Sequence, residues 1–277
     1  MIEVLTLPFT YPFMRDAALM AVIAAVPAAL LSCFLVLRGW SLMGDAISHA
    51  VLPGIVLAWV AGLPLLAGAF GAGMVCALVS GWVEENSRVK PDTVLGVVMS
   101  GMFGLGVVLY VAIPTGVHLD HILFGNILGV GPDDFISAGL IGATITVAIV
   151  LKWRDFAMWS FDPVQARVAG LPIRWLHYGL LAMISASVVA MLSAVGIILS
   201  VALLIAPGAI GFLTTRRLPA MLAVATAAAV LAALSGVWAS FWLDSAPAPT
   251  IVLVLTTMFI AAFGRRQWHA RRWTMAR

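Results

Sequence analysis

Charged residues are scarce in this sequence. Only 10% of its 277 residues are Asp, Glu, Lys or Arg, whereas about a quarter of the residues of an average soluble domain are charged. Apolar residues make up 63% of the chain, and the mean hydropathy is +1.10. These values exclude a water-soluble globular domain, and they also exclude an intrinsically disordered chain, which has low hydrophobicity. We expect the chain to reside in a lipid bilayer.

Motifs of enzymes and of disulfide-built folds are missing as well. The two cysteines, Cys33 and Cys76, lie in separate apolar runs and form no Cys-x-x-Cys pair. The sequence has no Gly-x-x-x-x-Gly-Lys-Ser/Thr loop, so the chain is not expected to bind ATP phosphates itself. His-Glu-x-x-His and Gly-x-Ser-x-Gly are also absent, so we expect neither an enzyme nor a permanently bound cofactor. The net charge of +3 is spread over short clusters, which argues against nucleic acid as a partner.

Long apolar segments divide the chain into membrane spans. A helix needs about 20 apolar residues to cross the hydrocarbon core. On this rule we predict nine spans, at 16–37, 42–62, 64–83, 92–113, 133–151, 175–193, 195–213, 219–243 and 247–264. Only Ser193 and Gly196 interrupt the run that holds the sixth and seventh spans, so eight spans is the alternative. The predicted fold class is all-α, a polytopic membrane protein with one domain over residues 1–277, because no polar connection is long enough for a separate core.

Lys and Arg in the short connections predict the orientation, because basic loops are retained in the cytoplasm. If the connections 38–41, 84–91, 152–174 and 214–218 and the tail 265–277 face inward, they hold 14 of the 15 basic residues. With nine spans, the carboxyl terminus is then cytoplasmic and the amino terminus is outside. With eight spans, only the side of the amino terminus changes. The first ten residues lack the basic segment of a cleavable signal, so the first span is expected to stay in the membrane.

Two ionisable side chains lie within a predicted span and away from its ends. Asp45 and His49 are four residues apart, which places both on one face of a helix. Ionisable groups in lipid are costly and mark functional sites. Carboxylate oxygen and imidazole nitrogen suit Mn²⁺, Fe²⁺ and Zn²⁺, so we predict a divalent-metal site at Asp45 and His49. The alternative is a structural pair in which the two groups satisfy one another and fix helix packing.

One such helix supplies two ligands, whereas a first-row divalent ion takes about four to six. A second copy of the helix across a dimer axis would complete a set of two Asp and two His around a central path. Ser48 could line this path, although serine in a membrane helix more often bonds to its own backbone. Pro53 frees a backbone carbonyl that could face the ion, and a simple kink is the alternative.

The connection 114–132 is predicted to lie on the outer side. It contains His118, Asp120 and His121 but no Lys or Arg. These three residues are further candidate metal contacts, and solvation of an exposed polar loop is the alternative. The apolar part of the connection, which includes Phe124 and Gly125, predicts partial re-entry into the membrane.

A short helix is predicted in the inward connection, at about 160–172. Asp162 can cap the helix with Pro163 at its first position, and Gly170 followed by Pro172 can end it. Tryptophans in the first half of the connection are typical of a helix lying on lipid. In contrast, the small residues Ala166 and Gly170 favour docking against another protein.

Five strings of the sequence resemble the membrane permeases of bacterial ABC importers for manganese, iron or zinc, the ABC-3 type. In chain order they are Arg38–Gly54, Asn86–Gly96, His118–Gly125, Phe161–Pro172 and Leu203–Gly208, so the similarity covers most of the chain. The manganese and iron branch of Gram-negative bacteria is the most similar. Pro91 is a small departure, because the family often has an acidic residue at this position.

The resemblance implies a type II ABC importer permease fold in the bacterial inner membrane. It implies three partners: cytoplasmic ATP-binding subunits, a periplasmic metal-binding protein and a second permease subunit, identical or homologous. It also implies that Asp45 and His49 hold the ion, and that Asp162, Pro163, Ala166, Gly170 and Leu171 belong to the helix that contacts the ATPase. We expect a permease subunit that moves Mn²⁺ or Fe²⁺ into the cytoplasm while its partner hydrolyses ATP. The alternatives are a zinc permease of the same family, or a secondary transporter or channel that works without an ATPase.

Overall fold

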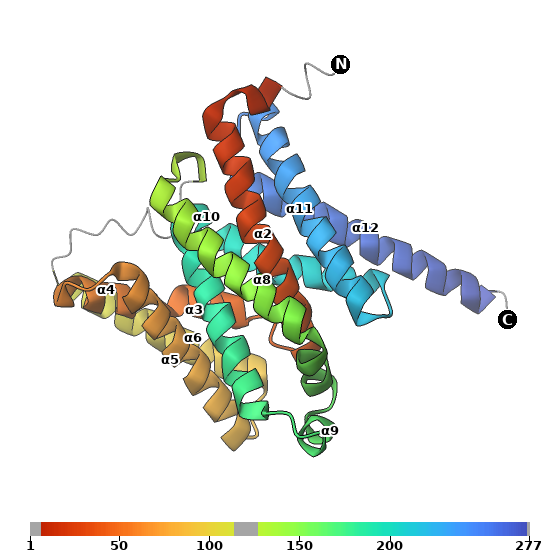
Figure 1. Cartoon of the computed structure of the whole chain (residues 1–277), viewed down its shortest axis with the longest axis horizontal. Helices are drawn as coiled ribbons and strands as arrows, with labels where there is room; N and C mark the ends of the chain where they lie inside the picture. Colours follow the sequence, from red (N-terminus) through yellow and green to blue (C-terminus); the bar gives the residue numbers. More distant parts are fainter. Residues whose placement is uncertain (1–6, 114–126, 276–277) are drawn as a thin grey trace.

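The computed structural model describes residues 7–113 and 127–275, which form α-helices and short 3₁₀ helices without a strand (Figure 1). The elements are η1 (Leu7–Thr10), α2 (Pro12–Arg38), α3 (Met43–Ala50), α4 (Leu52–Ala61), α5 (Leu65–Asn86), α6 (Pro91–Ala112), η2 (Ile127–Gly129), α8 (Pro132–Phe161), α9 (Pro163–Val168), α10 (Ile173–Thr214), α11 (Leu218–Trp242) and α12 (Pro247–Met275).

Nine helical segments in the described ranges are long and apolar enough to cross a membrane. They confirm the predicted all-α membrane fold, and eight of the nine agree with the predicted spans within four residues at either end. The second span is made of two helices, α3 and α4, which are divided at Val51.

The division between the sixth and seventh spans lies inside α10. Gly196, two residues after the start of the segment Ala194–Thr214, has φ 80° and ψ 173°, and it breaks the helical geometry close to the division from the segment Ile173–Leu192. This backbone region is essentially restricted to glycine. The prediction of nine spans, with a division near Gly196, is therefore confirmed over the alternative of eight.

The fifth span is longer than predicted. The apolar run ends near Leu151, but α8 continues to Phe161. Charged residues that follow the run are part of the helix, where Lys152 Nζ and Asp155 Oδ2 lie 3.2 Å apart at i,i+3 spacing and form an ion pair. The predicted end at 151 marked the end of the apolar segment and not the end of the helix.

The core of the molecule lies around α2, which packs against α8, α10 and α11. Many of its buried residues are alanines, so neighbouring helices approach closely. Gly208 of α10 lies against the backbone of Ser32, and a Cβ at this glycine would collide with it. The backbones of α2 and α10 are thus in direct contact.

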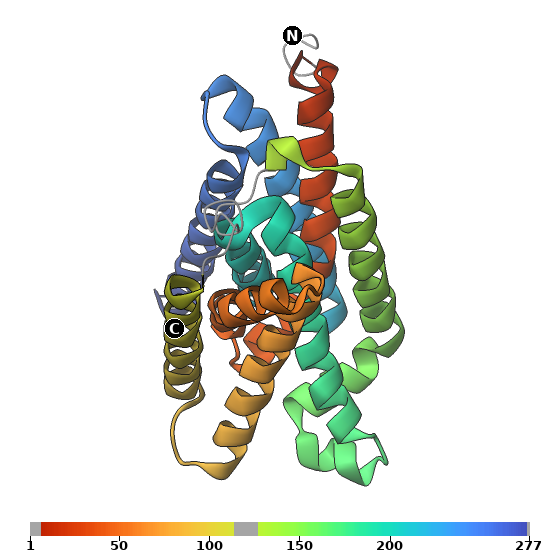
Figure 2. The same ribbon diagram turned by 90° about the vertical axis from the view of Figure 1, so that its left-hand side faces the viewer.

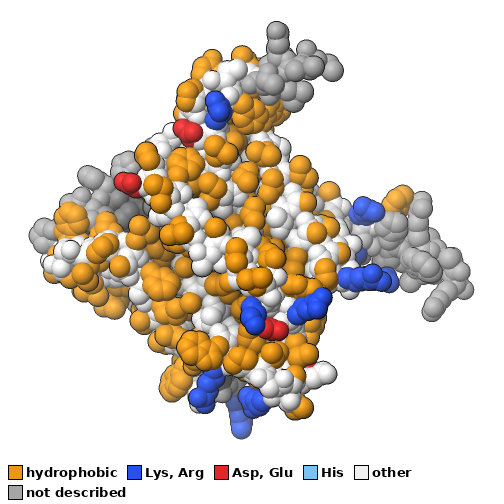
Figure 3. Space-filling model, in the orientation of Figure 1, with side chains coloured by type: hydrophobic (Ala, Val, Ile, Leu, Met, Phe, Trp, Pro, Cys, Tyr) orange, Lys and Arg blue, Asp and Glu red, His pale blue; other side chains and the backbone are white. Residues whose placement is uncertain are grey.

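The outer helices are much less buried. In the most apolar stretch of α6, only 17% of the residues are buried, and in those of α8 and α12 the share is 22%. Such exposure is expected of surfaces that face lipid or another subunit. Figure 3 shows hydrophobic side chains spread over the face in view, with most Lys and Arg toward its lower and right-hand parts.

The two ends of the molecule carry different connections. In both Figure 1 and Figure 2, the α5–α6 connection and α9 lie at one end, while η1 and the α11–α12 connection lie at the opposite end. The grouping agrees with the prediction that the connections 84–91 and 152–174 share one side of the membrane.

Candidate functional site

Helix α3 is enclosed by α5, α6 and α10. Six of its eight residues are buried, and the remaining two are Asp45 and His49, whose side chains are each 35% exposed. On the opposite side α3 is packed tightly: a Cβ at Gly44 would lie 2.8 Å from Leu204 of α10. The described residues therefore leave open only the face of α3 that carries the carboxylate and the imidazole.

The two side chains point the same way, as their spacing predicts. His49 Nε2 lies 3.5 Å from Asp45 Oδ1, which is longer than an ordinary N–H···O hydrogen bond of about 2.7–3.2 Å. The imidazole packs edge-on against Phe103 of α6, with ring centroids 5.6 Å apart. The pair thus has an aromatic wall on one side and remains accessible for a further ligand.

The residues around the pair explain its position. Ser48 is 1% exposed, and its hydroxyl donates to the backbone carbonyl of Asp45 at 2.7 Å, so it bonds to its own helix and does not line a path. Pro53 coincides with the break between α3 and α4, and it has no N–H to donate to the carbonyl of His49. Helix α6 fits closely beside this break, because a Cβ at Gly106 would lie 2.8 Å from Leu52 and Pro53.

The three loop candidates His118, Asp120 and His121, with Phe124 and Gly125, lie outside the described residues. Within the described ranges, no group of three or more His, Cys, Asp or Glu side chains comes together. The site on α3 consequently offers two candidate protein ligands per chain from the described part.

The predicted short helix is α9, and its cap has the expected geometry. Asp162 Oδ1 accepts hydrogen bonds from the backbone N–H groups of Val164 and Gln165, both at 2.9 Å. Pro163 occupies the first helical turn, and Gly170, two residues after the last helical residue, has φ +79°. The backbone N–H of Leu171 donates to the carbonyl of Ala166 at 3.1 Å and closes the turn.

The surface of α9 differs from the one that sequence reasoning indicated. Ala166 is 0% exposed, so it anchors α9 on the body of the protein and cannot itself touch a partner. The apolar side chains that face outward are Val164 and Val168, which are 73% and 84% exposed. Val164 and Val168 are four residues apart in a short capped helix, and this spacing could have predicted from the sequence that they share one outward face.

Comparisons with known proteins fit this architecture. The model of the ABC 3 transport family matches residues 10–266. The chain belongs to the ABC 3 transport family. It is 51% identical over 255 residues to the chelated iron transport system membrane protein YfeD of Yersinia pestis, covering 92% of this chain and 86% of that protein. It is 42% identical to the manganese transport system membrane protein MntC of Halalkalibacterium halodurans, covering 92% and 87% of the two chains.

A solved structure is similar over nearly the whole length. The structure described as PsaBC from Streptococcus pneumoniae in complex with Fab has a TM-score of 0.82 and 34% identity, covering 95% of both chains. As an ABC 3 family member, this chain is the membrane-spanning permease subunit of an ABC transporter and not its catalytic subunit. The alternative of a secondary transporter or channel does not fit this family.

Proposed function

We propose that this permease takes up Mn²⁺ or Fe²⁺, and that Asp45 and His49 hold the ion transiently on its way through the membrane. The observation that carries the proposal is that these two residues are the open face of the otherwise buried helix α3. Their oxygen and nitrogen atoms suit both metals. The similar proteins named above, for chelated iron and for manganese, support the same substrates.

A second permease subunit, identical or homologous, would supply the missing ligands. Two protein ligands per chain are too few for a first-row divalent ion. If the open faces of two α3 helices meet across a symmetry axis, two Asp and two His surround a central path. Such an ion is held weakly enough to leave again, which transport requires.

Energy would come from cytoplasmic ATP-binding subunits. The segment 160–172, with Asp162, Pro163, Ala166, Gly170 and Leu171, would transmit their movement, and the exposed Val164 and Val168 would form the contact. The basic connections then face the cytoplasm together with the carboxyl terminus. A periplasmic metal-binding protein would deliver the ion on the other side of the inner membrane, near His118, Asp120 and His121.

Metal uptake into vesicles tests the proposal. The permease is reconstituted with its ATPase and receptor, and ATP-dependent Mn²⁺ uptake is compared for the wild type, Asp45→Asn, His49→Gln and the control Asp92→Asn, which changes an exposed acid in the first turn of α6. We expect each site variant to lose about tenfold or more of the uptake, as loss of ligand geometry does at metal sites. The control should match the wild type. Uptake that survives both site changes refutes the role of the pair, and competition among Mn²⁺, Fe²⁺ and Zn²⁺ in the same vesicles separates the zinc alternative.

A further inference from the structure

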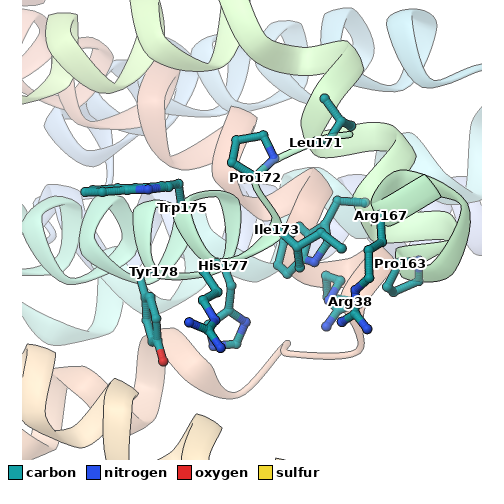
Figure 4. A pocket seen from close by; sticks show the side chains of 11 residues that line it. Arg38, Pro163, Arg167, Leu171, Pro172, Ile173, Trp175, His177 and Tyr178 are labelled. Atoms are coloured by element: carbon teal, nitrogen blue, oxygen red, sulfur yellow. The ribbon is translucent and has the colours of Figure 1, made fainter. Parts of the chain in front are cut away.

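A second polar site lies among the helix ends, on elements other than α3. A pocket of about 930 Å³ opens between the ends of α2, α8 and α10 and the short helix α9 (Figure 4). Its size is in the range of small-molecule sites, about 300–1,000 Å³. In Figure 4, Arg38 and Arg167 lie at one end of the pocket, and His177, Trp175 and Tyr178 lie at the other.

Aromatic rings hold one of the arginines in place. The guanidinium carbon of Arg38 lies 4.3 Å from the ring centre of Trp159 and 5.1 Å from that of Trp40. These two tryptophans are 2% and 1% exposed. His177 continues the wall, because its ring stands edge-on to Trp159 at 5.9 Å and to Trp40 at 5.4 Å. A stacked guanidinium of this kind presents its fork of N–H donors in a fixed direction.

Two further arginines give the pocket a strong positive charge. Arg167 of α9 and Arg174 of α10 line it, both are exposed, and neither forms an ion pair with a carboxylate of the described residues. The described lining contains no Asp or Glu. The guanidinium groups of Arg167 and Arg174 repel each other across one open space, and a phosphate oxyanion relieves this repulsion because its oxygens accept charge-assisted hydrogen bonds from both.

The pocket lies at the level where membrane helices end. Trp175 and Tyr178, 80% and 50% exposed, occupy the first turns of the span that begins at Ile173. Exposed Trp and Tyr at helix ends are typical of the membrane–water boundary. Basic pockets between transmembrane helices on the cytoplasmic side are suited to anionic lipid head groups.

We propose that this pocket binds the phosphate group of an anionic phospholipid. Arg167 and Arg174 hold the head group in a pocket that Arg38 also lines, and the exposed Trp175 and Tyr178 receive the upper part of the acyl chains. A free phosphate compound has the same charged group, but it has no apolar part that would need these aromatic side chains. The site shares α9 with the proposed ATPase contact, yet the binding itself requires neither metal nor ATP.

Lipid retention by the purified full-length permease tests the proposal. The protein is placed in nanodiscs that contain phosphatidylcholine with a minor fraction of phosphatidylglycerol of the same acyl chains, then stripped with mild detergent, and the retained lipids are quantified by mass spectrometry. The variant Arg167→Gln/Arg174→Gln removes two charges from the pocket. The control Arg88→Gln/Lys90→Gln removes two charges from the α5–α6 connection, which does not line the pocket.

We expect the wild type and the control to retain phosphatidylglycerol in excess, and the pocket variant to lose about fivefold of this preference for each arginine removed. Equal loss in the control would reduce the effect to general surface charge and overturn the proposal. If the protein shows no lipid preference, and inorganic phosphate raises its Tm in discs without phosphatidylglycerol, the proposed lipid ligand is wrong and the pocket binds a free phosphate compound. A pocket variant that keeps its lipid but no longer brings down the ATPase from native membranes would also overturn it, in favour of an acidic protein contact.

Discussion

The cap of α9 gives a sharp prediction about coupling. Replacing Asp162 by Ala removes the oxygen that accepts hydrogen bonds from the N–H groups of Val164 and Gln165, both at 2.9 Å. Helix α9 has only six residues, and a helix of this length is unstable without its cap and its packing. The change leaves the packing of Ala166 in place, so it acts on the cap alone.

The size of the expected effect follows from the known cost of removing N-cap side chains from helices. Loss of an N-cap side chain costs about 0.5–2 kcal/mol, which increases the population of locally unfolded α9 roughly 2- to 30-fold. Asp162 is exposed, so a value near the middle of that range, roughly 1 kcal/mol or about fivefold, is expected. Less of the ATPase movement would then reach the membrane helices, and the amount of metal imported per ATP hydrolysed should fall as the folded fraction of α9 falls.

Two measurements check the reasoning at different levels. Hydrogen exchange of the 163–171 backbone should accelerate about fivefold in Asp162→Ala, while Asp162→Asn, which keeps a capping oxygen, should exchange like the wild type. Asp155→Ala removes a nearby acid that caps no helix and serves as the second control. Unchanged exchange in Asp162→Ala would refute the structural argument. Accelerated exchange with an unchanged ratio of metal to ATP would refute the coupling role of α9.

Three further substitutions test the packing, and the first two have a matched control in the same helix. Gly196→Ala should lower the Tm of the purified protein, because the backbone angles φ 80° and ψ 173° cost a residue with a side chain about 1–3 kcal/mol. The control Gly179→Ala should leave the Tm unchanged, because a Cβ there meets nothing within 4 Å. Gly106→Val should reduce metal uptake, because the larger side chain moves α6 away from the α3–α4 break. The control Gly104→Val lies on the same helix with free space around it and should keep normal uptake. Equal effects of the two substitutions would contradict the packing argument. Val168→Asp should reduce co-purification of the ATPase with little effect on Tm, because this side chain is 84% exposed.

The sequence was most informative about the membrane spans. Apolar length and the placement of Lys and Arg are local properties, and they predicted nine helices and a division near Gly196. The same reasoning placed the end of the fifth span at residue 151, because the length of an apolar run does not indicate whether the helix continues through the charged residues that follow, as it does to Phe161. It also identified the cap at Asp162, since a capping residue followed by Pro is a local signal.

The site was predictable only in part. The spacing of Asp45 and His49 predicted a shared face, but which face stays open depends on how α5, α6 and α10 pack around α3. The outward position of Val164 and Val168 likewise depends on how Ala166 packs on the body of the protein. The arginine pocket was not predicted at all, because Arg38 and Arg174 are far apart in the chain and meet only in the folded structure.

The break beside His49 has a consequence for hydration. Pro53 has no N–H, so the carbonyl of His49 lacks its usual helical donor in the same segment that carries the carboxylate and the imidazole. Polar atoms at this depth require hydrogen bonds, and water is the only small donor that can reach an open face. Water is therefore expected at the pair between transport events. If Asp45 and His49 hold the ion as proposed, an arriving ion would exchange water for carboxylate oxygen and imidazole nitrogen and would not have to enter hydrocarbon.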